Sequence, residues 1–442
     1  MSSQPNIRLC RRLVRFAEAR RNFITDTTAM YIFATIVGII TGAGAFVLKT
    51  CIGAITKFLT ASYQAAAPNW QFLVIPVAGI LITGIFVRYI LRIDITHGTS
   101  KLISALRHHI YRLSSKIIYG PIIGASITLG FGGSAGAEGP IAYVGGAVGS
   151  QIGHLARLSP NLMKIMVACG GGAGIAGIFQ SPLGGFLFTL EVLKVELNTT
   201  AVMGVLTAAM AGGLTAYACA GFTPDIAFEG IHTFNSSLTL WYVVLGLACG
   251  VYSLYYSKIM ASMQMVFDAI SSPWLRNLSG GVILAAAIFF FPALYGEGYG
   301  IIAKMLAGDT QALYGGSLIT GWSLGLMLGI IVLIKCFAVS ASNSAGGVAG
   351  DFAPTLFAGC MVGLLFVTLI NPALPSQLPV TDFAFLAMAG CMAGIVRAPF
   401  MAVFITVEMT GCYPMLLPVV IVAAMSFGVV RLAARTRFFR LS

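Results

Sequence analysis

The sequence predicts an all-α, polytopic membrane protein built from two related halves, and two observations carry this prediction. Apolar residues make up 58% of the 442 residues and charged residues only 9%, whereas a soluble domain carries about 25% charged residues. Residues 132–140 (GGSAGAEGP) recur in related form 214 positions later, at 346–354 (GGVAGDFAP). Residues 176–191 recur 217 positions later, at 393–408. Two motifs in one order at nearly one spacing indicate a duplicated bundle, with its functional site between the halves at interrupted helices.

The apolar runs give the expected spans in order. The runs long enough to cross, or nearly cross, a bilayer core of roughly 30 Å are residues 30–47, 72–90, 238–256, 324–339 and 416–430. Other runs are short and interrupted by Gly or Pro, as expected of partial helices that line a cavity. The 52 Gly residues suit closely packed helices as well as interrupted ones.

The net charge of +12 gathers at the ends of the chain. Because cytoplasmic flanks carry an excess of Lys and Arg, both termini are expected in the cytoplasm, with an even number of crossings. Arg-rich segments also bind nucleic acid, but beside membrane spans we prefer the topological interpretation. The predicted segments are a basic cytoplasmic N-terminal arm (1–27), a first transmembrane repeat (28–217), a linker (218–237), a second transmembrane repeat (238–430) and a basic cytoplasmic tail (431–442).

The sequence offers no catalytic, metal or cofactor site. The nine Cys are scattered without a C-x-x-C pair, so they are expected to behave as small buried hydrophobes. An intramembrane hydrolase needs a nucleophile and a base. Ser134 and Ser181 are present, but no His shares their apolar context and Gly-x-Ser-x-Gly is absent. We therefore expect a protein that is not an enzyme.

The two Gly-rich runs predict an anion site. Each ends in Gly-Pro or Ala-Pro and leads into an apolar stretch, which is the pattern of a loop feeding a helix N-terminus. Such an N-terminus offers free backbone N–H groups and the positive end of the helix dipole, and glycines let an anion approach closely. Two such ends that point at one centre would bind an anion without a full positive charge.

Glu138 lies inside the first of these runs. Its carboxylate is itself an anion, so it competes with a permeant ion for the site until protonation releases it. The plainer interpretation is that Glu138 only caps its helix. Because an intramembrane carboxylate is costly and usually functional, we interpret Glu138 as a gate. Lys335 is expected either to tune the potential or to snorkel to an interface.

These residues carry a resemblance to a known family. Residues 136–140 (GAEGP) look like the Gly-Lys/Arg-Glu-Gly-Pro signature of the CLC family of chloride channels and chloride/proton antiporters, and residues 350–354 (GDFAP) like its Gly-x-Phe-x-Pro signature. Residues 181–191 and 398–410 resemble two further segments, and the resemblance spans about residues 30–430. It implies a CLC-type inverted repeat with many tilted and partial helices, and a homodimer with one pathway per subunit. The compact loops and short tail fit the prokaryotic type, in an inner membrane.

The resemblance also implies roles for single residues. Glu138 takes the place of the external gating glutamate, and the N–H groups of Asp351 and Phe352 that of the central anion ligands. The outer ligands would be the N–H groups around Gly136, Ala137 and Gly139. The family also uses a Ser hydroxyl, for which Thr99 and Ser100 are both candidates, and a late Tyr hydroxyl, whose place falls on Phe439.

Three departures from the family pattern affect the interpretation. Ala137 replaces a basic residue, and Asp351 puts a carboxylate beside a proposed ligand. We expect that carboxylate to turn away, capping the helix or bonding Asn343 or Ser344. The inner glutamate of the antiporters falls on Val192, and Glu191 lies about 100° away around the helix.

The sequence therefore predicts transport of chloride or similar small anions through a gated pathway in the bilayer, with proton coupling weak or absent. A coupled chloride/proton antiporter is the first alternative. A fluoride-selective relative or another ion-coupled solute transporter is the second.

Overall fold

The protein is described by a computed structural model that covers residues 26–64, 69–196, 198–223, 226, 233–319 and 321–435. Nearly all of the predicted N-terminal arm, residues 224–225 and 227–232 of the predicted linker, and the end of the tail, Phe439 included, lie outside these residues. Within them the regular structure is helical, and the one β-bridge joins Gly136 to Gly350. The all-α prediction is confirmed.

The helices form two compact units. Unit 1 comprises residues 1–46, 99–119 and 141–222, and unit 2 comprises residues 47–98, 120–140 and 223–442. The chain passes from one to the other within α2 (Asp26–Leu59), α5 (Lys116–Gly130) and α6 (Glu138–Leu155). The units cut across the predicted repeats, whose boundaries stay a prediction.

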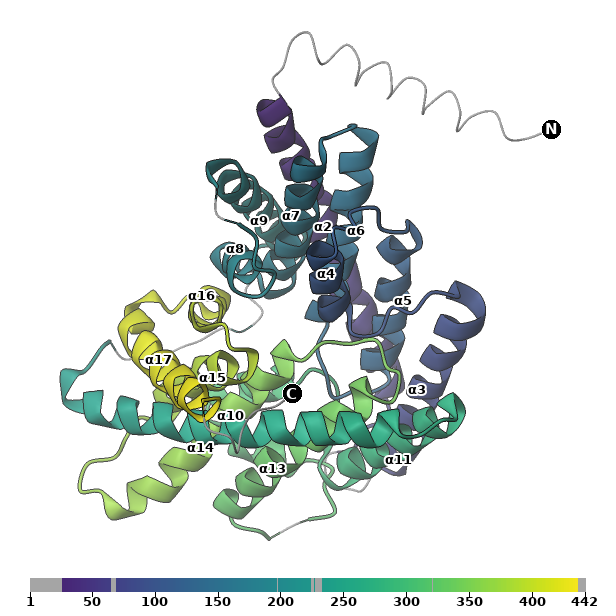
Figure 1. Ribbon diagram of the computed structural model, residues 1–442. Helices are drawn as coiled ribbons and strands as arrows, with labels where there is room; N and C mark the ends of the chain where they lie inside the picture. Colours follow the sequence, from purple (N-terminus) through teal and green to yellow (C-terminus); the bar gives the residue numbers. More distant parts are fainter. Residues whose placement is uncertain are drawn as a thin grey trace. The chain divides into compact units, whose positions relative to one another are not determined.

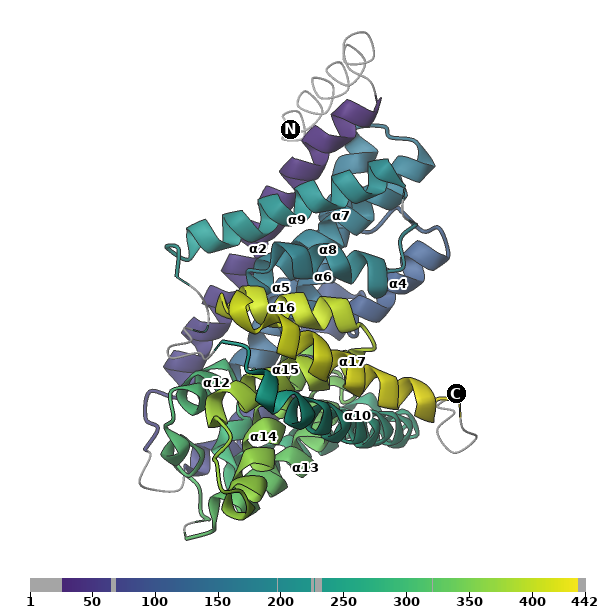
Figure 2. The same ribbon diagram turned by 90° about the vertical axis from the view of Figure 1, so that its left-hand side faces the viewer.

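Unit 1 is organised around α7 (Pro160–Phe179), which is almost entirely buried. It lies against both α8 (Pro182–Glu191) and α9 (Thr199–Cys219) (Figure 2). Gly145 and Gly149 of α6 face α7 so closely that a Cβ atom would come within 2.0 Å of the carbonyl oxygens of Gly170 and Met166. Small residues thus let two helix backbones touch. A shorter helix, α4 (Gly98–Arg107), also belongs to unit 1 except for its first residue.

More of the described helices belong to unit 2 than to unit 1 (Figure 1). Its α-helices are α3 (Ile75–Ile85), α10 (Thr239–Asp268), α11 (Pro273–Phe290), α12 (Tyr299–Leu306), α13 (Leu324–Asn343), α14 (Phe352–Ile370), α15 (Val380–Val396), α16 (Pro399–Thr410) and α17 (Leu416–Ala433). A π-helical turn, η2 (Phe86–Leu91), prolongs α3. Short 3-10 turns connect the rest: η1 (Trp70–Leu73), η3 (Ser236–Leu238), η4 (Pro292–Leu294), η5 (Thr310–Leu313), η6 (Asn371–Ala373) and η7 (Tyr413–Met415).

The glycine crossing of unit 1 recurs in unit 2. Gly359 and Gly363 of α14 lie 214 positions after Gly145 and Gly149. A Cβ atom at either would come within 2.4 Å of a carbonyl oxygen of α15. The α6–α7 and α14–α15 pairs therefore touch through equivalent glycines, as two related halves require. In unit 2, α16 and α17 also pack against α15, and Figures 1 and 2 show the three together in yellow.

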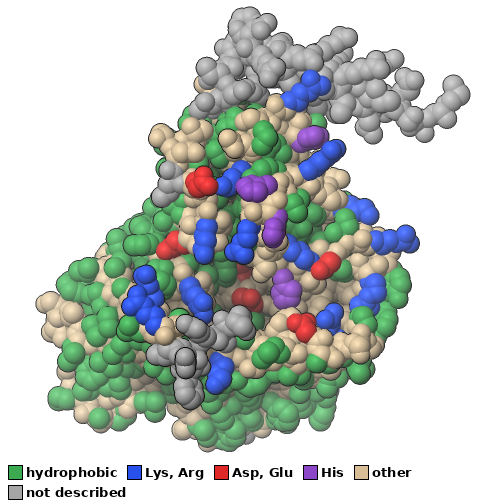
Figure 3. Space-filling view, in the orientation of Figure 1, with side chains coloured by type: hydrophobic (Ala, Val, Ile, Leu, Met, Phe, Trp, Pro, Cys, Tyr) green, Lys and Arg blue, Asp and Glu red, His purple; other side chains and the backbone are tan. Residues whose placement is uncertain are grey.

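The surface and the helix lengths are those of a membrane protein. Among the described residues, nine helices are long and apolar enough to cross a bilayer, and three shorter apolar helices accompany them. Large hydrophobic side chains such as Leu240, Val251 and Leu326 are exposed, and Figure 3 shows broad hydrophobic areas in green. Helix length does not tell which of the twelve cross, so the even number of crossings and the location of the termini stay predictions.

Candidate functional site

The two Gly-rich loops meet within unit 2 in a reciprocal bridge. The N–H of Gly136 donates to the carbonyl of Gly350 at 2.9 Å, and the N–H of Gly350 donates back at 2.6 Å. Gly132 and Gly346 start the two loops with φ values of +96° and +100°, in the left-handed region that favours glycine. Helices α6 and α14 begin two residues after the bridge, at Glu138 and Phe352. The N-terminal ends of α6 and α14 thus follow two loops that are hydrogen-bonded to each other.

Each loop is also held by a hydroxyl from the helix that precedes the other loop. The N–H of Ser134 donates to Oγ of Ser342 at 2.9 Å, and the N–H of Val348 donates to Oγ1 of Thr128 at 3.1 Å. Acceptors and donors are both related by the 214-residue spacing. The duplication is therefore preserved at the level of single hydrogen bonds.

The carboxylate of Glu138 fills the N-terminus of the opposite half. Its side chain is 1% exposed, and Oε1 accepts a hydrogen bond from the N–H of Phe352. A Cβ atom at Gly136 or Gly350 would come within 2.0 Å or 2.6 Å of a carboxylate oxygen, so both glycines leave the room this carboxylate occupies. Glu138 thus binds the first N–H of α14, which means that capping its own helix is not its whole role.

The carboxylate of Asp351 takes one of the two expected directions. Oδ1 accepts a hydrogen bond from Nδ2 of Asn343, the last residue of α13. Within the described part of the chain it makes no capping bond to α14. His97 adds an electrostatic attraction. Ser344, the other expected partner, instead donates to Oε1 of Gln264 at 2.6 Å.

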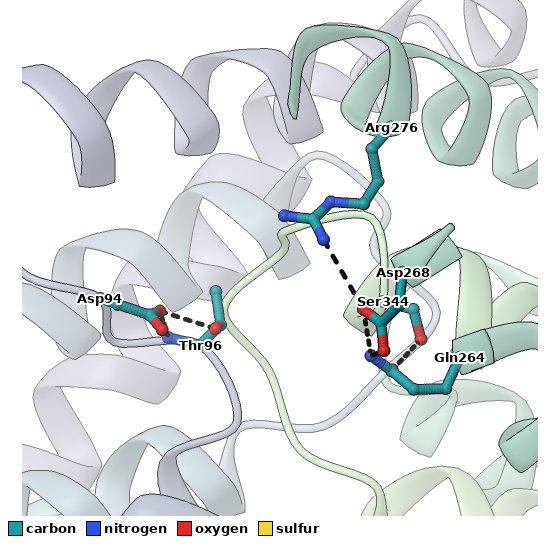
Figure 4. Close-up of polar contacts among 6 residues, drawn as sticks. All are labelled: Asp94, Thr96, Gln264, Asp268, Arg276 and Ser344. Atoms are coloured by element: carbon teal, nitrogen blue, oxygen red, sulfur yellow. Dashed lines mark hydrogen bonds and ion pairs between the residues drawn. The ribbon is translucent and has the colours of Figure 1, made fainter. Parts of the chain in front are cut away.

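A polar cleft of about 680 Å³ opens next to Asn343. Figure 4 shows its polar contacts, in which Asp268 accepts from Gln264 at 3.0 Å and lies 3.7 Å from a guanidinium nitrogen of Arg276. Asp94 accepts from Thr96. Four basic side chains also line this first cleft: Arg88, Arg92, His97 and Arg276. Its three arginines outnumber its two carboxylates by one, so the charged side chains of the lining have a net positive charge.

A second cleft, of about 610 Å³, is lined by Lys57, Lys304 and Glu297 among others. Glu297 reaches from this cleft to the N-terminus of α6, where its Oε1 accepts from the N–H of Ala137 at 3.0 Å. That N–H is one of the predicted outer anion ligands. Glu297 was not among the residues predicted from the sequence, although its Gly-Glu-Gly setting marks a tight loop.

Lys335 lies in the interior of unit 2. Its side chain is fully buried, and Nζ donates to Oγ of Ser134 at 2.8 Å and lies 4.5 Å from the centroid of the Phe357 ring. Glu297 attracts it electrostatically. The snorkelling interpretation is therefore wrong, because a hydroxyl and an aromatic face stabilise the ammonium inside the protein.

Tyr256 of α10 was also missed by the sequence analysis. It is fully buried, and its hydroxyl has no hydrogen-bond partner among the described residues. The hydroxyl is close enough to Asp351 and Glu138 to interact with both electrostatically. A buried unpaired hydroxyl is unfavourable, so this one is suited to a ligand. Tyr252, Tyr255 and Tyr256 lie close together in α10, and the sequence gave no sign of which hydroxyl would be unpaired.

The remaining predicted site residues belong to unit 1 or fall outside the described residues. Thr99 and Ser100 lie in the first turn of α4, half-buried and exposed respectively. Glu191 is the last residue of α8 and Val192 its C-cap, both half-buried. Their part in a pathway stays a prediction, as does that of Phe439. Within the described residues no cluster of His, Cys, Asp and Glu is suited to a metal ion.

Comparison with known proteins gives a consistent result. The sequence model of the family described as "Voltage gated chloride channel" matches residues 78–431. A ClcB-like protein of Ralstonia nicotianae is 27% identical over 401 residues, which cover 87% of this chain and 90% of that protein. The H(+)/Cl(-) exchange transporter ClcA of Klebsiella pneumoniae is 28% identical over 311 residues, covering 68% of this chain and 62% of the transporter.

Solved structures share the fold. A slow cyanobacterial Cl-/H+ antiporter superimposes with a TM-score of 0.80 at 20% identity, covering 95% of this chain and 97% of the antiporter. A CLC-type fluoride/proton antiporter gives 0.76 at 20% identity, with 91% and 95% covered. At these identities the likeness concerns the fold, and it bears out the predicted inverted repeat with tilted and partial helices.

Proposed function

Because the chain belongs to the voltage-gated chloride channel (CLC) family, we propose that it carries chloride across the membrane through a pathway gated by Glu138. The observation that carries the proposal is the hydrogen bond from the N–H of Phe352 to the Glu138 carboxylate, inside a cradle of two glycines. An anionic group already occupies the position that a permeant anion would need. A chloride ion has the same charge and accepts the same N–H, so it competes for this place when Glu138 leaves.

The proposed central site consists of backbone N–H groups and one hydroxyl. The N–H groups of Phe352 and Asp351 belong to the start of α14, where the helix dipole favours an anion. The hydroxyl of Tyr256 supplies the donor that Phe439 lacks. Thr99 and Ser100 remain alternative donors, and the outer ligands are the N–H groups around Gly136, Ala137 and Gly139.

We propose that proton coupling is weak or absent. Val192 carries no proton at the inner position, and Glu191 precedes it at the end of α8, on a different side of the helix. Glu196, a little further on, is engaged with Lys164 at 3.2 Å. The coupled antiporter stays the alternative, because the Klebsiella pneumoniae relative is an exchange transporter.

The first experiment tests the gate. In liposomes containing the purified protein, Glu138→Gln should mimic the neutral side chain, so chloride efflux should persist and lose its dependence on pH. Asp309→Asn, at an exposed carboxylate of unit 2, is the matched control and should keep the wild-type profile. A Glu138→Gln profile that still follows pH like the wild type contradicts the gating role.

The second experiment tests coupling. A chloride gradient is imposed across liposomes with the membrane potential clamped, and external pH is followed. Uphill proton movement at a fixed ratio to chloride would establish the antiporter and defeat weak coupling. Glu191→Gln should then be tested as the substitute relay. Competition of fluoride with chloride in the same liposomes separates the fluoride-selective alternative.

The proposal includes the setting of the protein. We place it in a prokaryotic inner membrane as a homodimer, with both termini in the cytoplasm. Labelling of single introduced cysteines from either side of the membrane tests the location of the termini. Cross-linking in the membrane tests the dimer.

A further inference from the structure

We propose that Glu297 is a second gating carboxylate, which closes the anion pathway towards the second cleft. It occupies the N–H of Ala137 and has to leave before an anion binds there. The inference rests on the proposed pathway through Glu138 and adds a residue to it.

Glu297 lies between the second cleft and the start of α6. Glu297 lines the second cleft, yet its Oε1 accepts from the N–H of Ala137 at 3.0 Å, 160 positions away in the chain. Ala137 immediately precedes α6, so its N–H is part of the anion-attracting end of that helix. An anion moving from the second cleft to this N–H meets the carboxylate of Glu297 in its place.

The loop around Glu297 supports this position of the residue. Gly296 and Gly298 flank it with φ values of +67° and +91°, and a Cβ atom at Gly298 would come within 2.5 Å of the Phe357 ring. Tyr295 anchors the loop by donating from its hydroxyl to the carbonyl of Gly130 at 2.8 Å. The loop is therefore anchored next to Glu297, and the Glu297 side chain can rotate without breaking that anchor.

Glu297 also interacts electrostatically with two other side chains of unit 2. Lys335 attracts Glu297, and Glu138 repels it. These interactions link the two carboxylates within unit 2. Movement of one of them therefore affects the other, so we expect the two to act as a coupled gate rather than as two independent ones.

Together the two carboxylates fill both converging helix ends. Glu138 holds the N–H of Phe352 at α14, and Glu297 holds the N–H of Ala137 at α6. This arrangement has no free place for an anion at either of those two N–H groups. It describes a closed pathway in which the ion has to displace one carboxylate after the other.

The experiment compares chloride binding by Glu297→Gln and by the wild type. The amide oxygen still accepts from Ala137, so the loop keeps its hydrogen bond, but the competitor loses its charge. Charge-assisted hydrogen bonds are stronger than neutral ones by about 1 kcal/mol, so chloride affinity should rise roughly three- to tenfold. Calorimetric titration of chloride into detergent-solubilised protein gives the affinity, and chloride efflux from liposomes gives the rate.

Asp309→Asn is the matched control, since it removes one negative charge from an exposed position of the same unit. Its affinity should equal that of the wild type. A Glu297→Gln affinity equal to that of Asp309→Asn overturns the proposal and leaves Glu297 as a structural cap. Unfolding temperatures of both variants in the absence of chloride show whether Glu297→Gln acts on binding or on stability. A changed stability with unchanged affinity also overturns it.

The double variant Glu138→Gln/Glu297→Gln tests the coupling. If the carboxylates act together, its change in affinity differs from the product of the two single changes by at least about threefold. Failure here is distinct from failure of the proposed function. If the wild type carries no chloride at all, the proposed function fails; if Glu138→Gln alters the pH profile while Glu297→Gln changes nothing, only the second gate fails.

Discussion

The loops at 132–140 and 346–354 have the same backbone and different side chains. Each starts at a glycine in the left-handed region, pairs with the other through the Gly136–Gly350 bridge, and receives a hydroxyl from the other half. At the start of the helix, however, the first loop has Glu138 where the second has Phe352. The carboxylate of the one therefore accepts the N–H of the other.

This difference separates what the duplication supplies from what each half adds. The repeated backbone brings two helix ends together and gives both an attraction for anions. The unrepeated side chains decide which end carries the gate and which end the gate binds. Three pairs of substitutions and one single substitution test that division.

The largest effect is expected at the bridge glycines. A Cβ atom at Gly350 would come within 2.7 Å of the backbone nitrogen of Gly139, so Gly350→Ala forces a backbone shift and should destabilise the protein by about 1–3 kcal/mol. At Gly136 the nearest atoms all belong to the Glu138 carboxylate, which rotates away. Gly136→Ala should stay folded and carry chloride independently of pH. Thermal unfolding in detergent and efflux measurements check both, and equal destabilisation would contradict the comparison.

The mirrored hydroxyls come next. Ser342→Ala and Thr128→Val each leave a buried N–H without its acceptor, at a cost of about 1–3 kcal/mol. Thr128 also exchanges a hydrogen bond with Thr83 at 3.0 Å, so its loss should destabilise more. The unfolding temperatures of the two variants give the order. A smaller destabilisation by Thr128→Val than by Ser342→Ala would contradict the order that the hydrogen bonds indicate.

Two tyrosines of α10 are expected to show smaller effects, one on stability and the other on chloride affinity. Tyr252 donates to the carbonyl of Val332 at 3.0 Å, so Tyr252→Phe should cost about 1 kcal/mol of stability and leave chloride affinity unchanged. Among the residues that the structure describes, the Tyr256 hydroxyl has no such partner to lose. Tyr256→Phe should keep stability without chloride and weaken chloride binding roughly threefold to tenfold. Calorimetry and unfolding with and without chloride separate the two, and equal affinities in both variants would remove Tyr256 from the site.

The smallest effect is expected at Asp351. Its carboxylate is turned to Asn343, so Asp351→Asn should leave chloride affinity within about threefold, less than about 0.7 kcal/mol. A hundredfold gain, about 2.8 kcal/mol, would show instead that the carboxylate faces the ion and opposes it. Titration of chloride into the variant distinguishes the two.

The sequence was informative where the duplication repeats a local pattern. The helix starts at Glu138 and Phe352 and the contact between Asp351 and Asn343 follow from glycine, proline and short-range chemistry. Glu297 could not be found in this way, because its partner Ala137 lies 160 positions away and no second copy of its loop exists for comparison. Tyr256 was equally hidden, and for Lys335 the sequence left two locations open, since burial and an unpaired hydroxyl depend on which helices pack together. Composition reports only that such helices are apolar.

The Gly136–Gly350 bridge has a consequence for the speed of opening. Because both loops are tied through their backbones, separating them requires collective motion, which takes microseconds to milliseconds. Exposed side chains turn in picoseconds to nanoseconds; the buried, hydrogen-bonded side chain of Glu138 turns more slowly, but without separating the loops. A pathway whose loops stay bridged while its side chains turn can therefore open faster than its helices move. Single-channel or fast-mixing records should contain that rapid component.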